Sequence, residues 1–157
     1  PYRDGIFLRS AAMAALGRST RVETRFTVRP ACFHGEADAA TRATQRREYL
    51  RNIAETDYTL CLRGYGNYSF RFFEAMSLGR PPLLIDTDCV LPLDFLLDYR
   101  RVAVIVPQHH LRRAADHVAQ HHAALDALAQ LDLQRRVRAF WAEWLAPERF
   151  FRNVALH

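Results

Sequence analysis

The fold is decided by the stretch DYTLCLRGYGNYSFRFFEAMSLGRPPLLI, residues 57–85. Its first part, residues 57–62, is rich in residues that favour strands, and we expect a short buried strand there. Residues 63–68 contain two glycines and an asparagine, which predict a loop. A helix is expected over residues 69–77, with serine as its capping residue and Gly79 beyond its end. The closing PPLLI run predicts a second strand, and this order is typical of a parallel βαβ unit.

The alternation of strands and helices continues toward the C-terminus. A third strand is predicted at residues 102–106 (VAVIV), after a short helix over residues 93–97. Two longer helices are expected over residues 109–131 and 133–145, and residues 147–153 predict a further helical turn.

The N-terminal part follows the same pattern. Residues 9–17 have apolar side chains at helical spacing, and residues 22–28 alternate in the way that suits a strand. Residues 31–38 predict a loop, and residues 39–55 an amphipathic helix whose narrow apolar stripe includes Tyr49. We therefore expect an α/β fold, with a mostly parallel sheet covered by helices on both faces.

Length and composition narrow the class of protein. A chain of 157 residues that is 50% hydrophobic and 25% charged is typical of one folded domain, residues 1–157, and not of a disordered tail. No apolar run approaches the roughly 20 residues that span a bilayer. Residues 1–8 do not resemble a signal peptide, and the chain starts without methionine, so we expect a fragment of a longer protein.

The charge and the cysteines suggest a compartment. All 22 basic residues are arginine and the net charge is +5, a bias that resembles GC-rich bacterial coding more than a nucleic-acid interface, so no nucleic-acid partner is expected. The three cysteines are far apart and form no CxxC pair, which favours a reducing compartment. We expect the cytoplasm of a bacterium, or the cytosolic face of its membrane.

The loop between the first strand and the next helix has the chemistry of an anion site. Gly64 and Gly66 let a ligand approach the main chain, and Ser69 opens a helix whose first N–H groups attract phosphate. Arg63 and Arg71 flank this point and can each donate paired hydrogen bonds to phosphate oxygens. A nucleoside diphosphate would fit, although the pattern is neither GxGxxG nor a P-loop.

Glu74 lies three residues after Arg71 on the same helix face, where a carboxylate could accept hydrogen bonds from a ribose diol. The alternative is purely structural: a glycine turn, followed by an ion pair between Arg71 and Glu74 within the helix. Ligands of parallel sheets bind beyond the carboxyl ends of the strands, which adds residues 86–93 to the candidate region.

Residues 58–99 resemble the C-terminal part of the exostosin family of glycosyltransferases. Leu83 and Leu84 replace Val-Ile of the family pattern, Leu93 replaces Phe, and Tyr99 replaces Trp. The residues that match the family pattern, or stand at its positions, are Cys61, Gly64, Ser69, Arg71, Glu74, Ala75, Gly79, Pro82, Leu83, Leu84, Asp86, Asp88, Leu91, Pro92, Asp98 and Tyr99.

This resemblance implies a GT-B enzyme, in which two Rossmann-like domains face each other across a cleft. The chain is similar to the donor-binding half, a Rossmann-like three-layer domain, and the N-terminal acceptor domain would be missing from it. By the same resemblance Glu74 binds the donor ribose, while Ser69, Arg63 and Arg71 take the diphosphate. The other expected donor contacts are Gly64, Tyr65, Gly66, Asn67, Asp86 and Asp88.

The activity implied is inverting transfer of a sugar from a UDP-sugar to a glycan or polysaccharide acceptor, without a metal or other cofactor. No general base is evident in the sequence. One alternative is a nucleotide-binding or interaction module that has lost catalysis, and another is a different GT-B branch with another donor. If the source is eukaryotic, the resemblance implies the Golgi lumen.

Four other features have a structural explanation that we favour. Asp86-Thr87-Asp88 matches the DxD that holds a metal in the other glycosyltransferase fold, but the motif is short and common. His117 and His121 share a helix face and could bind zinc, but they have no evident third ligand, so we expect a solvated helix face. Trp141 and Trp144 are expected to form a core stripe, or a contact with the other domain. Cys61 is expected to be buried packing.

Overall fold

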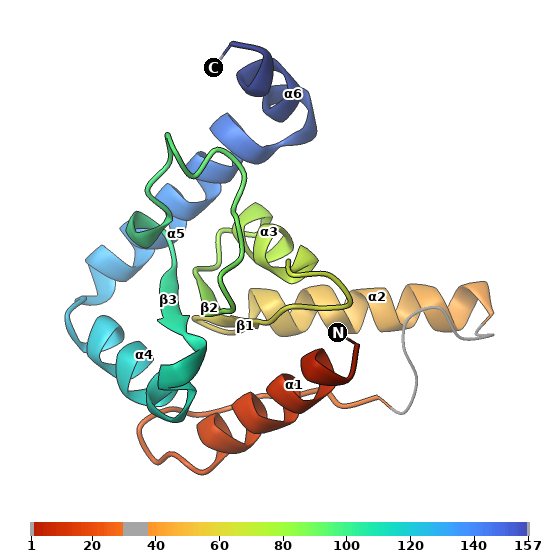
Figure 1. Ribbon diagram of the computed structural model, residues 1–157, viewed down its shortest axis with the longest axis vertical. Helices are drawn as coiled ribbons and strands as arrows, with labels where there is room; N and C mark the ends of the chain where they lie inside the picture. Colours follow the sequence, from red (N-terminus) through yellow and green to blue (C-terminus); the bar gives the residue numbers. More distant parts are fainter. Residues whose placement is uncertain (1, 30–37, 157) are drawn as a thin grey trace.

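The computed structural model describes residues 2–29 and 38–156, and it contains a three-stranded parallel sheet (Figure 1). The strands are β1 (Thr59–Cys61), β2 (Pro82–Asp86) and β3 (Val104–Pro107), in the spatial order β1-β2-β3. Leu60 pairs with Leu83 and Leu84 pairs with Ile105. The three strands predicted between residues 57 and 106 are confirmed, each within two residues of its expected ends.

Side chains from alternate positions of the strands build two cores. On one face of the sheet, Leu83 and Ile85 of β2 pack with α1 (Tyr2–Gly17) and α4 (Ala114–Ala123). Leu83 and Ile85 are both more than 95% buried, as expected for a central strand with both faces covered.

On the other face, Cys61 and Leu84 pack with α3 (Phe70–Ser77) and α5 (Ala127–Phe140). Phe72 of α3 is the largest fully buried side chain of this core. Helices therefore cover both faces of the sheet, and the predicted three-layer, Rossmann-like arrangement is confirmed (Figure 1).

Local capping explains where α3 and α2 begin and end. Gly79 has φ of +68° and follows the C-cap of α3, which confirms its predicted role as a helix terminator. The long helix α2 (Ala39–Ala54) begins where the Asp38 carboxylate accepts a hydrogen bond of 2.7 Å from the Thr41 amide. The amphipathic helix expected over residues 39–55 is confirmed.

The connection from β2 to β3 differs from the prediction. Residues 93–97 form hydrogen-bonded turns and not a helix, because Leu93 has φ of +55°, which is incompatible with a helix. The short 3₁₀ helix η1 (Tyr99–Arg101) follows, and the buried Tyr99 ring fixes the connection through a hydrogen bond of 2.7 Å from its hydroxyl to the Pro92 carbonyl.

The strand predicted over residues 22–28 is wrong. Residues 23–29 have no regular secondary structure, and no strand of the described chain pairs with them. The Arg25 carbonyl instead accepts a hydrogen bond of 3.2 Å from the Asn52 side chain of α2. Alternation alone cannot supply a neighbouring strand, and this is why the prediction failed. The loop expected over residues 31–38 lies outside the described residues, except for Asp38.

The C-terminal helices are divided at a different point from the one predicted. The 3₁₀ helix η2 (Gln108–Arg113) leads into α4. The N-cap of α5 is Asp126, whose carboxylate accepts a hydrogen bond of 2.8 Å from the Ala129 amide. This cap moves the break from residue 132 to residues 124–126. A π-helical turn, η3 (Trp141–Leu145), and α6 (Pro147–Leu156) complete the chain, with α6 at the far end of α5 (Figure 1).

The aromatic residues of this C-terminal part behave as predicted. Trp141 and Trp144 are partly buried against the core formed with α3 and α5, which confirms the core stripe. No helix within residues 2–29 and 38–156 is both long and apolar enough to cross a membrane.

Candidate functional site

Two loops meet at the edge of the sheet where β1 and β2 end. The Asn67 side-chain amide donates hydrogen bonds of 3.0 Å to the Thr87 carbonyl and 3.2 Å to the Asp88 carbonyl. The Thr87 hydroxyl donates in return to the Asn67 side-chain oxygen. The two stretches that the sequence placed beyond the strand ends are therefore joined, as the topology of a parallel sheet requires. Asn67 has a positioning role in this structure, and its predicted contact with a donor stays a prediction.

The glycine loop after β1 is closed on itself and packed against α1. The Gly64 amide donates to the Tyr68 carbonyl at 3.0 Å. On the other side, a Cβ atom on Gly5 of α1 would lie 2.9 Å from the Gly64 carbonyl oxygen, so glycine is required at this close approach. The Tyr65 side chain projects from the loop and is 80% exposed.

The start of α3 lies directly after the glycine loop, where the sequence predicts a phosphate site. Ser69 is the N-cap, has an extended backbone and is 92% buried, and its hydroxyl makes no capping hydrogen bond. This differs from the cap that we expected of its side chain. The backbone N–H groups of the first turn still point toward the loop end of the helix, where anions are favoured.

Glu74 lies one turn further along α3, and α2 supplies its partners. Arg46 Nη1 forms an ion pair with Glu74 Oε1 at 2.8 Å, and the Tyr49 hydroxyl donates to Glu74 Oε2. The ion pair that the structural alternative placed between Arg71 and Glu74 is replaced by this one from α2. The Glu74 side chain is still 33% exposed.

Arg71 meets the same tyrosine. Its guanidinium carbon lies 4.9 Å from the centre of the Tyr49 ring, and its Nε donates to the Tyr49 hydroxyl at 3.3 Å. Burial, followed by the hydrogen bond to Glu74, raises the pKa of Tyr49 to about 12. The phenol therefore remains a hydrogen-bond donor throughout the neutral pH range.

Arg46 and Tyr49 are the residues of this site that sequence reasoning missed. They lie three residues apart on one face of α2, and Tyr49 had been assigned only to the apolar stripe. The i, i+3 spacing of an arginine and a tyrosine was the available signal, but nothing local indicated that this face meets α3.

Arg63 follows β1 by two residues and is half buried. Its Nε is buried and has no hydrogen-bond partner among the described residues. Cys61, at the end of the same strand, is fully buried, and its burial raises the pKa of the thiol well above the ordinary value. The expected packing role of Cys61 is confirmed. The structure thus brings Arg71 and Glu74 together on Tyr49 and places Arg63 at the neighbouring strand end.

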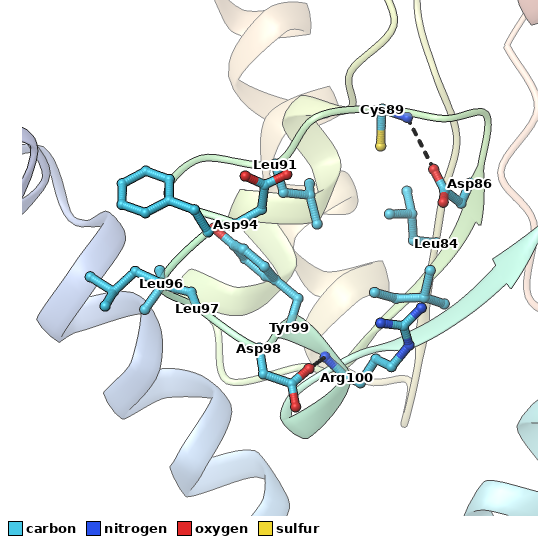
Figure 2. Close-up of a pocket in the computed structure, with 12 residues that line it drawn as sticks. Leu84, Asp86, Cys89, Leu91, Asp94, Leu96, Leu97, Asp98, Tyr99 and Arg100 are labelled. Carbon is cyan, nitrogen blue, oxygen red and sulfur yellow. Dashed lines mark hydrogen bonds between the residues drawn. The ribbon is translucent and has the colours of Figure 1, made fainter.

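A pocket of about 490 Å³ lies between the sheet and the β2–β3 connection (Figure 2). Leu84 and Ile105 contribute apolar wall, and Asp86, Asp94, Asp98 and Arg100 contribute charge. Of the predicted site residues, Asp86 is the one that lines this pocket.

The two aspartates of the DxD sequence have different surroundings. Asp86 Oδ1 accepts a hydrogen bond of 3.1 Å from the Cys89 amide, which holds the turn after β2 (Figure 2). Asp88 is exposed, with φ of +57°. Among residues 2–29 and 38–156, no three His, Cys, Asp or Glu side chains are grouped as a metal ion would need. The expectation of a metal-free reaction stays a prediction.

Two neighbouring histidines at the end of α4, His121 and His122, pack around the Tyr58 side chain. His121 Nδ1 lies 2.9 Å from the Tyr58 hydroxyl, and the His121 and His122 rings both meet the Tyr58 ring edge to face. Burial, followed by the neighbouring His122, lowers the pKa of His121. These contacts are more specific than the solvated helix face that we expected.

Comparisons with known proteins agree with the resemblance in the sequence. The family model of the Exostosin GT47 domain matches residues 9–121. This range includes α2, α3 and both loops. Exostosin-1 of Drosophila melanogaster is 25% identical over 132 residues, which cover 78% of this chain and 16% of that protein. The chain therefore spans a small part of this relative. An animal relative gives no support to the bacterial source that the arginine content suggested.

Proposed function

Because the chain belongs to the exostosin GT47 family, we propose that it is the donor-binding part of a glycosyltransferase. The donor is a UDP-sugar, and the acceptor is a hydroxyl group of a glycan or polysaccharide. A second, N-terminal domain faces this one across the cleft and supplies the acceptor contacts.

The observation that carries the proposal is the meeting of Arg71 and Glu74 beside the joined loops. Arg71 keeps the hydrogen-bond donors of its Nη groups for a diphosphate, since the Tyr49 hydroxyl takes only its Nε. Glu74 is one-third exposed and can accept hydrogen bonds from a ribose. The separation of these residues by one helical turn suits the spacing of phosphate and ribose in one nucleotide.

The chemistry proposed is displacement at the anomeric carbon. An acceptor oxygen attacks this carbon from the face opposite the UDP, the bond to the β-phosphate oxygen breaks, and the configuration inverts. The negative charge that develops on the diphosphate is stabilised by Arg63, Arg71 and the N-terminus of α3. The acceptor proton passes to a general base, which we place in the N-terminal domain.

We place the sugar of the donor beside Asp86 in this proposal. This carboxylate uses one oxygen to hold the turn after β2 and lines the pocket with its side chain. Asp88 stands at the same turn and is exposed, and its backbone carbonyl accepts a hydrogen bond from the Asn67 side chain. Carboxylates at this position would select a sugar by accepting hydrogen bonds from its hydroxyl groups.

A non-catalytic module is the second candidate. The observation that favours it is that both Glu74 oxygens already have partners within the protein. In such a module the carboxylate would join α2 to α3 and would not bind a nucleotide.

Calorimetric titration of the chain with UDP, and then with a panel of UDP-sugars, separates the two candidates. We expect saturable UDP binding that Arg71→Ala weakens by about 10- to 100-fold, since a hydrogen bond to a charged group contributes about 1.5–3 kcal/mol. The matched control is Arg135→Ala, which removes the same charge from an exposed position of α5. A folded chain that binds no UDP at concentrations up to about 1 mM (about 4 kcal/mol) would favour the non-catalytic module.

A further inference from the structure

The Tyr49 side chain contacts both Arg71 and Glu74. Its hydroxyl donates to Glu74 and accepts from Arg71 Nε, and its ring lies under the Arg71 guanidinium. The Arg46 guanidinium carbon is 5.4 Å from the centre of the same ring, and Arg46 forms the ion pair with Glu74. Two cations and one carboxylate are thus arranged around one aromatic ring.

The hydrogen bonds leave room for a ligand. A carboxylate has about four acceptor positions, and the contacts from Arg46 and Tyr49 use one on each oxygen of Glu74. The remaining positions can accept from the two hydroxyl groups of a ribose. The direction of the carboxylate is fixed by α2 before any ligand arrives, which lowers the entropy cost of binding.

We propose that Tyr49 and Arg46 are positioning residues of the donor site, which orient Glu74 toward the ribose and Arg71 toward the diphosphate. This inference rests on the proposed function. It assigns to α2 a part in nucleotide recognition, whereas the sequence motif is confined to α3 and the loops.

The attachment of α2 to the domain does not depend on these two side chains alone. Ile53 lies about one helical turn after Tyr49. It is 1% exposed and provides the buried anchor of the helix. The Arg46 side chain is 47% exposed. Changes at Arg46 and Tyr49 are therefore expected to leave the fold intact and to act on the orientation of Glu74 and Arg71.

The test combines protein variants with two ligands that differ in one ribose hydroxyl group, and it compares their affinities. UDP and 2′-deoxy-UDP are titrated into the 157-residue chain and its variants, with circular dichroism to check folding. In the unaltered chain we expect UDP to bind about tenfold more tightly than 2′-deoxy-UDP, because the missing hydroxyl leaves a carboxylate without its partner. In Tyr49→Phe, which keeps the ring, we expect this preference to fall to about threefold or less.

Two more variants complete the cycle. Arg46→Gln tests the second positioning residue at an exposed site, where folding is least at risk, and should also reduce the preference. Tyr58→Phe is the matched control, because it removes a tyrosine hydroxyl that is bonded to His121 and not to the site. It should keep the tenfold preference.

Each outcome decides the inference. A preference lost in Tyr49→Phe and Arg46→Gln but kept in Tyr58→Phe supports it. If both variants keep the preference, or weaken the two ligands by the same factor, Tyr49 and Arg46 do not position Glu74, while UDP binding by the unaltered chain still supports the proposed function. If the unaltered chain binds no UDP, the proposed function fails and the inference fails with it. If it binds both ligands equally, the ribose role of Glu74 is wrong.

Discussion

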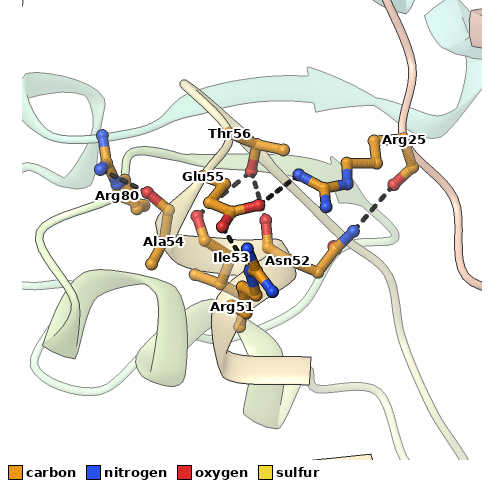
Figure 3. Close-up of polar contacts among 8 residues, drawn as sticks. All are labelled: Arg25, Arg51, Asn52, Ile53, Ala54, Glu55, Thr56 and Arg80. Carbon is orange, nitrogen blue, oxygen red and sulfur yellow. Dashed lines mark hydrogen bonds and ion pairs between the residues drawn. The ribbon is translucent and has the colours of Figure 1, made fainter. Parts of the chain in front are cut away.

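Two of the arginine–glutamate networks that involve helix α2, one at Glu55 and one at Glu74, differ in the cations that they leave outside the ion pairs. Near its C-terminal end, Glu55 is held by Arg25 at 2.6 Å and by Arg51 at 2.5 Å (Figure 3). In the middle of the helix, Arg46 and Tyr49 reach across to Glu74 on α3. Both networks join α2 to another segment of the chain.

The difference lies in the position of the cations. At Glu55 two guanidinium groups face one carboxylate at the surface, and the network ties the segment that contains Arg25 to α2 (Figure 3). At Glu74, the second cation, Arg71, is stacked on Tyr49 and is not paired with the carboxylate. An ion pair alone therefore says little about function, whereas Arg71 lies outside the ion pair of Glu74 and contacts Tyr49 through its Nε, as the proposed diphosphate contact requires.

The largest expected effect comes from removing the buried side chain of the helix that carries both networks. Ile53→Ala should lower the free energy of unfolding by about 2–5 kcal/mol, because it leaves a cavity under the one buried side chain of α2. Urea unfolding followed by circular dichroism measures it. A loss below about 1 kcal/mol would mean that the polar networks, and not burial, hold α2 in place.

A smaller effect should separate the two glutamates. Glu74→Gln removes the charge that orients the ribose and holds Arg46, and we expect UDP affinity to fall by about tenfold or more. Glu55→Gln makes the same change in the other network and should leave UDP affinity unchanged. Calorimetric titration of both variants measures the contrast, and equal effects would contradict the functional distinction between the networks.

The smallest effect concerns pH. Hydrogen bonds from Arg51 and then from Arg25 hold the pKa of Glu55 below its ordinary value of 4.5. A carboxylate with a lowered pKa stabilises the folded chain above pH 4.5 and loses this contribution as the pH falls through the folded-state pKa. We therefore expect Glu55→Gln to be slightly less stable than the unaltered chain at neutral pH, with the difference vanishing in acid. Thermal unfolding at several pH values measures it, and a difference that grows in acid would contradict the assignment.

The βαβ unit could be predicted from the sequence because its signals are local. The glycine loop, the start of α3 at Ser69, Gly79 at the helix end and the apolar strands each follow from neighbouring residues, although the Ser69 hydroxyl does not make the expected capping hydrogen bond. The fold class and the family resemblance came from the same stretch, and both are confirmed.

The features that could not be predicted depend on contacts between distant segments. Residues 22–28 have the alternation of a strand, but a strand exists only where another one pairs with it. Tyr49 and Arg46 belong to the site because α2 packs beside α3, which no local pattern shows. The break between α4 and α5 is different, since Asp126 is an ordinary capping residue and its signal was present in the sequence.

The close approach of Gly5 to the Gly64 carbonyl has a consequence for the order of folding. Strands β1 to β3 and α3 lie within about fifty consecutive residues, so their contacts close short chain loops. The contact between α1 and the glycine loop joins residues 59 positions apart, and closing this longer loop costs more entropy. The sheet is thus expected to assemble first, and the glycine loop gains its final support only when α1 docks.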